Sequence, residues 1–169
     1  MRIREARRRD AMALVALQRS VLAEDRWFIR TEAEAPSLDD VERDLPRYRD
    51  SDNSVWLVAE DGRQVCGHLM LTGGVWVRTR HEASFVVMVA ASHRGRGVGR
   101  ALVQQALQWA TTCPMLQRVG LNVMADNAAA IGLYEALGFA EEGRRIGHLA
   151  DPERGEVWMG LTLESAARD

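Results

Sequence analysis

The stretch of sequence that decides the fold is VVMVAASHRGRGVGR, residues 86–100. It begins inside Glu82–Ala90, an apolar, valine-rich run too short for a typical globular helix, which reads as a buried central strand. It leads into Gly97–Thr112, where apolar residues recur at helical spacing until Pro114 ends the pattern. The predicted order is therefore strand, glycine-rich turn and helix N-terminus.

This turn has the properties of a phosphate-binding site. Glycines let successive N–H groups point into one concavity, and a helix N-terminus carries partial positive charge. Arg94, Arg96 and Arg100 would add positive charge, or they could simply lie in solvent. The turn lacks the Gly-Lys-Ser/Thr of a Walker A loop, and it follows several strands, whereas a dinucleotide-binding turn follows the first. It indicates a pyrophosphate site, and a flexible glycine-rich connection is the alternative.

Working outward, the remaining patterns predict a mixed α/β domain that spans residues 1–169. Asp61-Gly62 is a hairpin signal in which both turn positions favour positive φ. Asp10 is expected to cap the first helix, Ser37 and Asp40 to form the capping box of the second, and Gly138 to occupy the C′ position of the last. The expected strands are Met1–Arg7, Val55–Glu60, Gln64–Gly73, Glu82–Ala90, Val119–Met124, Phe139–His148 and Val157–Leu163; the expected helices are 10–24, one from Ser37, Gly97–Thr112 and Asn127–Leu137.

Composition narrows the functional class. The net charge of -2 argues against a nucleic-acid partner, and 47% hydrophobic with 27% charged residues is ordinary for a globular protein. All 22 basic residues are arginine, so no lysine can form a Schiff base or act as a general base. Cys66 and Cys113 are expected to be buried free thiols. The N-terminus lacks an apolar segment and no run is long enough to span a membrane, so a cytoplasmic protein with no membrane partner is expected.

Two motifs together resemble those of the GNAT superfamily of acetyl-CoA-dependent N-acetyltransferases. Arg94-Gly95-Arg96-Gly97-Val98-Gly99 resembles the Arg/Gln-x-x-Gly-x-Gly/Ala signature. The segment 127–139 resembles a second signature, Asn-x-x-Ala-x-x-x-Tyr-x-x-x-Gly-Phe. The resemblance implies a small single-domain member with the GNAT fold. In that fold a central, mostly antiparallel sheet of six to seven strands is splayed at Val86–Ala90 and Val119–Met124, and about four helices surround it.

The resemblance also implies acetyl-CoA (acyl-CoA) as co-substrate, with no metal. The backbone of Val87, Met88 and Val89 would pair with the pantetheine arm, opposite Leu121–Val123. Asn127 would contact the cofactor, cap the last helix, or do both. The residues that would hold the pyrophosphate are Arg94, Gly95, Arg96, Gly97, Val98, Gly99 and Arg100.

Tyr134 matches the general acid of the family, which protonates the leaving thiolate; a core tyrosine is the alternative. The catalytic base is unassigned, because Asn122 and Ser84 stand where some relatives have glutamate. Glu82 and His81 are the neighbouring candidates, either of which could deprotonate an ammonium directly or through water. Water held by Ser84 or Asn122 is another candidate, and Glu82 could instead be a solvated strand end.

The resemblance implies that the acceptor is a small-molecule amine, such as an amino acid, or a protein N-terminal amine. The expected acceptor site lies between Asp25–Pro36, Gly73–Arg80 and the loop His148–Gly155, where Trp27, Phe28, Trp76 and Trp158 would either shape the site or fill the core. A homodimer is compatible with the family. Two other hypotheses remain: a non-catalytic acyl-CoA-binding module, and a nucleic-acid-binding protein that uses the arginines of the turn.

Overall fold

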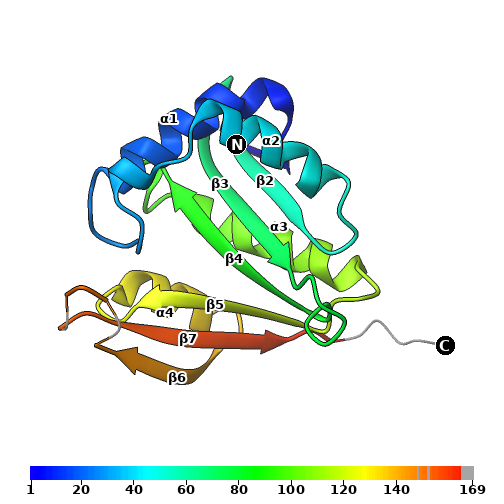
Figure 1. Cartoon of the computed structure of the whole chain (residues 1–169), viewed down its shortest axis with the longest axis vertical. Helices are drawn as coiled ribbons and strands as arrows, with labels where there is room; N and C mark the ends of the chain where they lie inside the picture. Colours follow the sequence, from blue (N-terminus) through cyan, green and yellow to red (C-terminus); the bar gives the residue numbers. More distant parts are fainter. Residues whose placement is uncertain (148, 152, 165–169) are drawn as a thin grey trace.

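The computed structural model describes residues 1–147, 149–151 and 153–164. Over these residues the chain forms one seven-stranded sheet with the order β1-β2-β3-β4-β5-β7-β6, and four α-helices (Figure 1). The strands are β1 Arg2–Glu5, β2 Val55–Asp61, β3 Gln64–Gly73, β4 Glu82–Val89, β5 Arg118–Met124, β6 Ala140–Ile146 and β7 Gly155–Thr162. The helices are α1 Ala11–Leu22, α2 Leu38–Arg49, α3 Val98–Thr112 and α4 Ala128–Glu135.

Helices cover both faces of the sheet, because each strand alternates its side chains between two apolar layers. On one face, Leu14 of α1 and Val41 of α2 pack against Trp56 and Val58 of β2. On the other, α3 and α4 join the larger core, in which Leu102 is fully buried. Figure 1 shows α1 and α2 in front of β2 and β3, with α3 behind them.

The sheet is splayed between β4 and β5, its one parallel pair among the described strands. These strands pair only from Glu82↔Arg118 to Ser84↔Gly120, whereas β4 stays paired with β3 as far as Val89. Figure 1 shows β4 and β5 close together at one end and diverging toward the other. From Phe85 onward the edge of β4 that faces β5 therefore has no strand partner. The mixed α/β fold with a splayed, mostly antiparallel sheet is confirmed.

Three local predictions need correction. The hairpin turns at Gly62-Arg63, because Asp61 pairs with Gln64, and only Gly62 has positive φ there. Asp10 precedes α1 without capping it, because its carboxylate accepts hydrogen bonds from Arg4 and from the N–H of Arg7. Gly138 has φ +92° but lies two residues beyond the C-cap of α4.

Other local expectations are met. Ser37 and Asp40 form the predicted capping box of α2, with Asp40 N–H donating to Ser37 Oγ at 3.2 Å. Cys66 and Cys113 are buried free thiols. Within the described part of the chain, no helix has the length and apolar character needed to cross a bilayer.

Candidate functional site

A cavity of about 930 Å³ occupies the splay between β4 and β5 and reaches both faces of the sheet. Its walls come from the second half of β4, the end of β5, the glycine-rich turn, α4 and the segment that joins α1 to α2. A cavity of this size falls in the range of small-molecule and cofactor sites. The sequence-predicted residues that line it are Trp27, Phe28, Ser84, Val87, Met88, Val89, Arg94, Gly95, Gly97, Val98, Gly99, Arg100, Asn122, Val123, Asn127 and Tyr134.

The glycine-rich turn has the backbone shape that an anion cradle needs. Gly95 and Gly97 have φ of +70° and +80°, a region in which a side chain is strained. A Cβ built at either position would have no atom within 4 Å, so the two glycines leave space open beside the backbone. Gly97 is the N-cap of α3, and thus the turn directs N–H groups and the helix dipole toward the cavity. These features fit a pyrophosphate.

The arginines of the turn differ in their surroundings. Arg94 donates from Nε to the carbonyl of Val89 at 2.9 Å, and both its Nη atoms reach the Glu24 carboxylate at 2.6 Å. The hydrogen bonds from Arg94 lower the pKa of Glu24. The Arg94 side chain thus ties the turn to the end of α1. Arg100 lines the cavity, whereas Arg96 is exposed and outside the lining.

Tyr134 is both a core residue and a residue of the cavity wall. Its ring packs edge-on against Phe85 and Phe139, with centroids 5.6 and 6.0 Å away, as a core tyrosine would. Its side chain also lines the cavity, and the phenol oxygen has no hydrogen bond from the described residues. Burial raises the pKa of Tyr134 to about 12. The phenol is therefore protonated at neutral pH and is available as a proton donor.

Asn127 likewise both caps a helix and lines the cavity. Its Oδ1 accepts a hydrogen bond from the N–H of Ala130 at 3.2 Å, which makes it the N-cap of α4. It also lines the cavity, as does the turn that leads into α3. The helix-capping role is thus observed, and a cofactor contact is sterically available.

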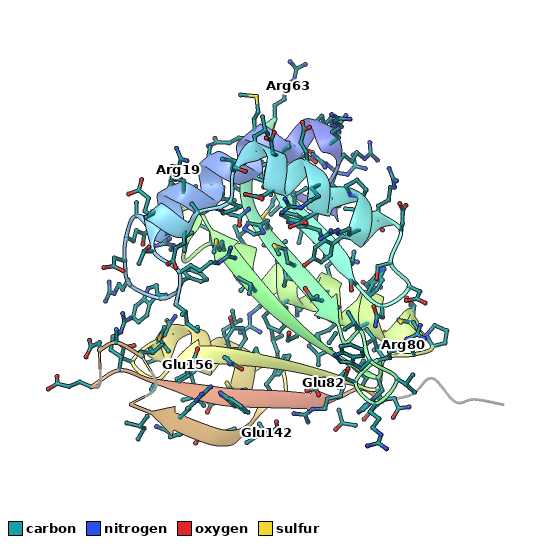
Figure 2. All side chains as sticks on the ribbon, viewed as in Figure 1. Arg19, Arg63, Arg80, Glu82, Glu142 and Glu156 are labelled. Carbon is teal, nitrogen blue, oxygen red and sulfur yellow. The ribbon has the colours of Figure 1, made fainter. Side chains whose placement is uncertain are left out.

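The candidates for the catalytic base divide into two groups. Ser84 and Asn122 line the cavity, but neither is a proton acceptor at neutral pH. Glu82 and His81 are absent from the described lining. Glu82 lies at the closed end of the splay, where its carboxylate accepts from Arg118 Nε at 3.0 Å (Figure 2). A catalytic role of Glu82 stays a prediction that no contact among the described residues supports.

The sequence analysis missed Glu156 and gave no role to Arg30. Glu156, at the start of β7, is 4% exposed, lines the cavity and lies toward the open end of the splay (Figure 2). Arg30 lines the cavity together with Trp27, Phe28 and Ile29. A signal for Glu156 existed: it is a lone acidic residue in the otherwise apolar run of β7.

The remaining acceptor-site predictions are only partly met. The segment Asp25–Pro36 supplies lining residues, whereas Gly73–Arg80 supplies none that the structure describes, and Trp76 is 74% exposed. Trp158 is not in the described lining but shares a sheet face with Asn122, its cross-strand partner. His148 and Pro152 of the predicted tail loop lie outside the described residues.

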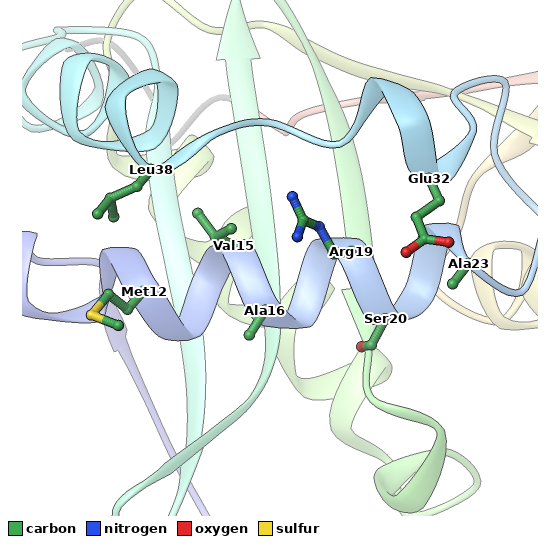
Figure 3. Close-up of a pocket in the computed structure, with 8 residues that line it drawn as sticks. All are labelled: Met12, Val15, Ala16, Arg19, Ser20, Ala23, Glu32 and Leu38. Carbon is green, nitrogen blue, oxygen red and sulfur yellow. The ribbon is translucent and has the colours of Figure 1, made fainter.

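A second hollow, of about 520 Å³, lies on the outer side of α1 beneath the segment that leads to α2 (Figure 3). It is lined mainly by apolar side chains of α1, including Met12 and Val15, with Arg19 and Glu32 at one end. From the segment Asp25–Pro36 it contains only Glu32, and it contains none of the expected cofactor-binding or catalytic residues. The cavity in the splay is therefore the candidate site.

Comparisons with known proteins agree with this geometry. The model of the Acetyltransferase (GNAT) family matches residues 20–139. A 65-residue segment is 37% identical to spermidine N(1)-acetyltransferase of Vibrio cholerae, and covers 38% of each chain. An 87-residue segment is 34% identical to the L-amino acid N-acetyltransferase of Escherichia coli, and covers 52% of this chain and 54% of the relative. The chain therefore matches about half or less of the length of these curated relatives.

The whole fold also has a solved counterpart. An acetyltransferase of the GNAT family from Streptococcus pneumoniae superposes with a TM-score of 0.91 at 27% identity, over 96% of this chain and 99% of the other. The family model covers well over half of the chain, including the glycine-rich turn and the segment that carries Asn127 and Tyr134. The chain belongs to the Acetyltransferase (GNAT) family.

Proposed function

We propose that this protein transfers an acetyl group from acetyl-CoA to a primary amine by direct attack in a ternary complex. The observation that carries the proposal is the cavity in the splay, which places the glycine-rich turn, the unpaired edge of β4 and the phenol of Tyr134 around one space. Each of these has a separate task in acyl transfer from a thioester. Their convergence favours an enzyme over a module that only binds acyl-CoA.

The donor side would be held mainly by the backbone. The N–H groups of the turn at Gly95–Arg100 would hold the pyrophosphate, with Arg100 adding charge. The free edge of β4 at Val87–Val89 would pair with the amides of the pantetheine arm, as an added strand does. When bound, acetyl-CoA supplies an activated acyl group whose leaving group is a thiolate.

Tyr134 would assist departure of that thiolate. Its pKa of about 12 exceeds the 8.5 or so of a solvated thiol, so donation to a thiolate in water would be uphill. Inside the cavity the same desolvation also raises the pKa of the thiol, so the pKa values of the proton donor and the proton acceptor become more similar. The neutral phenol can therefore hydrogen-bond the developing thiolate and then protonate it.

Two measurements test the proposal. Saturating acetyl-CoA is expected to raise the melting temperature, since a ligand at 100 times its Kd stabilises the native state by about 2.7 kcal/mol. Free CoA thiol is then measured with amino acids, spermidine and a short peptide as acceptors. Thiol release with at least one acceptor is expected. A thermal shift without thiol release from any amine would instead indicate a non-catalytic acyl-CoA-binding module, and no shift would refute the donor site.

A further inference from the structure

An ion pair ties the end of α1 to the glycine-rich turn. Glu24 follows Ala23, the C-cap of α1, and its carboxylate accepts one hydrogen bond from each Nη atom of Arg94, both at 2.6 Å. The side chains of Glu24 and Arg94 are 31% and 37% exposed. A two-pronged, partly buried pair of this kind fixes the relative position of its two residues better than a single surface contact does.

Arg94 also binds the free edge of β4. Its Nε donates to the carbonyl of Val89 at 2.9 Å. The peptide unit that follows Val89 directs its N–H, that of Ala90, to Cys66 of β3, so its carbonyl, on the opposite side of a trans peptide, points away from β3. The Val89 carbonyl therefore lies on the edge where the pantetheine arm would pair. One guanidinium thus joins the end of this edge to Glu24.

The residues directly after Glu24 form a wall of the cavity. Asp25 has φ +47° and is the one residue other than glycine with positive φ in the part of the chain that the structure describes. This conformation is strained for a residue with a side chain, so neighbouring contacts must hold it. Figure 1 shows the segment after α1 extending toward the open end of the splay. Four consecutive residues of this wall segment, residues 25–30, line the cavity: Trp27, Phe28, Ile29 and Arg30.

Two other contacts hold the wall segment farther along. The carbonyl of Arg26 accepts a hydrogen bond from Arg154, the residue before β7. Phe28 packs against a cluster of side chains from α1 and β4. Neither contact involves the glycine-rich turn. Among the described residues, the Glu24–Arg94 pair is thus the hydrogen-bonded link between the turn and the start of the wall segment.

On the basis of the proposed acetyl transfer, we infer that Glu24 and Arg94 are positioning residues that couple the cofactor site to the wall of the acceptor site. A pyrophosphate held by the turn restricts the turn, and the turn holds the Arg94 guanidinium. The guanidinium in turn holds Glu24 beside the strained Asp25. The wall segment is therefore more ordered when acetyl-CoA is bound, and the acceptor loses less free energy in ordering it.

The first test requires binding but no turnover. Hydrogen exchange is followed by mass spectrometry in peptides that cover residues 24–31 and 86–100, with and without saturating acetyl-CoA. In the wild type, acetyl-CoA is expected to slow exchange in both peptides, by about 10-fold at 24–31. In Glu24→Ala the slowing at 86–100 should persist, whereas that at 24–31 should fall below about 3-fold. Equal slowing at 24–31 in the two proteins, or none in the wild type, would overturn the inference.

The second test separates the acceptor from the donor. Glu24→Ala is expected to raise the KM of the acceptor amine about 10-fold, while kcat and the Kd for acetyl-CoA stay within about 3-fold of wild type. Glu24→Asp, which keeps the carboxylate, should recover part of the loss. A residue that only stabilised the fold would lower the melting temperature without this split. A weaker Kd for acetyl-CoA with an unchanged acceptor KM would confine the pair to the donor site and refute the coupling.

A matched control and a double variant test the pair itself. Glu42 of α2 pairs with Arg8 at 2.9 Å, is 34% exposed and lies outside the described lining, so Glu42→Ala should keep the wild-type acceptor KM. Because Glu24 and Arg94 act together, Glu24→Ala combined with Arg94→Gln should raise the acceptor KM no more than the more damaging single change. Increases that multiply in the double variant, or an equal increase in Glu42→Ala, would contradict the inference.

The results also separate this inference from the proposed function. If acetyl-CoA binds but no amine releases thiol, the proposed acetyl transfer fails, and the exchange experiment still decides whether the two sites are coupled. If thiol release is normal but exchange at 24–31 does not respond to acetyl-CoA, only the coupling is refuted. Absence of acetyl-CoA binding would overturn both.

Discussion

At the scale of single residues, Tyr134 shows how one side chain can serve both packing and chemistry. Its ring completes an edge-on cluster with Phe85 and Phe139, while the same side chain lines the cavity. Phenylalanine would preserve the ring contacts and remove only the hydroxyl. The effect of the packing can therefore be separated from the effect of the proton.

Tyr134→Phe is expected to lower kcat by about 10²- to 10⁴-fold, because the thiolate loses its proton donor. The Kd for acetyl-CoA should stay within about 3-fold, since the variant leaves the turn and β4 intact. Tyr48→Phe is the matched control, because Tyr48 hydrogen-bonds Thr72 on the surface, away from the cavity. Rates are measured by thiol release and affinity by calorimetry. An unchanged kcat in Tyr134→Phe would show that Tyr134 is only a core residue.

Two glycines, Gly97 of the turn and Gly132 of α4, offer a second comparison at this scale. A Cβ at Gly97 and one at Gly132 would both meet nothing within 4 Å, but only Gly97 has positive φ. Gly97→Ala is therefore expected to cost about 1 kcal/mol of unfolding free energy and to weaken acetyl-CoA binding. Gly132→Ala, inside α4, should increase the unfolding free energy by about 0.4 to 1 kcal/mol. Urea unfolding measures the free energy of unfolding of both variants. The prediction requires a lower value than wild type for Gly97→Ala and a higher value for Gly132→Ala.

At the scale of elements, the sequence predicted the strands and helices because these depend on periodicity and on glycine and proline positions. The splay was implied by the resemblance to the GNAT superfamily. Errors arose where a tertiary contact overrode a local preference. Asp10 would have capped α1, but Arg4 of the neighbouring strand binds its carboxylate at 2.7 Å. Glu156 was missed because strand periodicity does not show which face of β7 meets a cavity.

The closed end of the splay is held by an ion-pair network that joins three strands. Arg118 of β5 pairs with Glu82 of β4 and with Glu142 of β6. Because these side chains are partly exposed, each pair is worth about 1 kcal/mol or less. The network would hold β4, β5 and β6 together at the end where they meet, so that β4 and β5 diverge only beyond Ser84.

Glu82→Gln separates a structural from a catalytic role for this carboxylate. We expect a loss of about 1 kcal/mol or less in unfolding free energy and a kcat/KM within about 3-fold of wild type. Thiol-release kinetics and urea unfolding on the same preparation provide the two numbers. A 10²-fold loss of kcat at unchanged stability would instead make Glu82 the catalytic base.

At the scale of the whole molecule, the layer between the sheet and α1 contains polar groups that the reaction does not use. His68 of β3 is fully buried, and its Nδ1 accepts from Trp56 Nε1 at 3.2 Å. Its Nε2 and the Nε2 of Gln18 have no hydrogen-bond partner among the described residues. Protonation of His68 would place a second donor against the Trp56 N–H. The folded protein therefore requires the neutral imidazole.

This requirement makes the stability of the protein depend on pH. Burial, aided by the charge of Arg30, lowers the pKa of His68 to about 3, whereas the unfolded chain takes up the proton near pH 6.5. The unfolded state thus binds more protons below pH 6.5, and stability is complete above that value and falls progressively toward pH 3. Between pH 7.5 and 5.5 His68 alone should remove about 1.4 kcal/mol.

Urea unfolding at the two pH values measures this loss, and His68→Asn isolates it. Asparagine offers an acceptor to Trp56 but does not titrate, so the variant should be less stable at pH 7.5 yet lose about 1.4 kcal/mol less than wild type on acidification. All other pH-dependent contributions are common to the two proteins and cancel in the comparison. An equal loss in the two proteins would mean that folding does not change the proton uptake of His68, and it would contradict the requirement for a neutral imidazole.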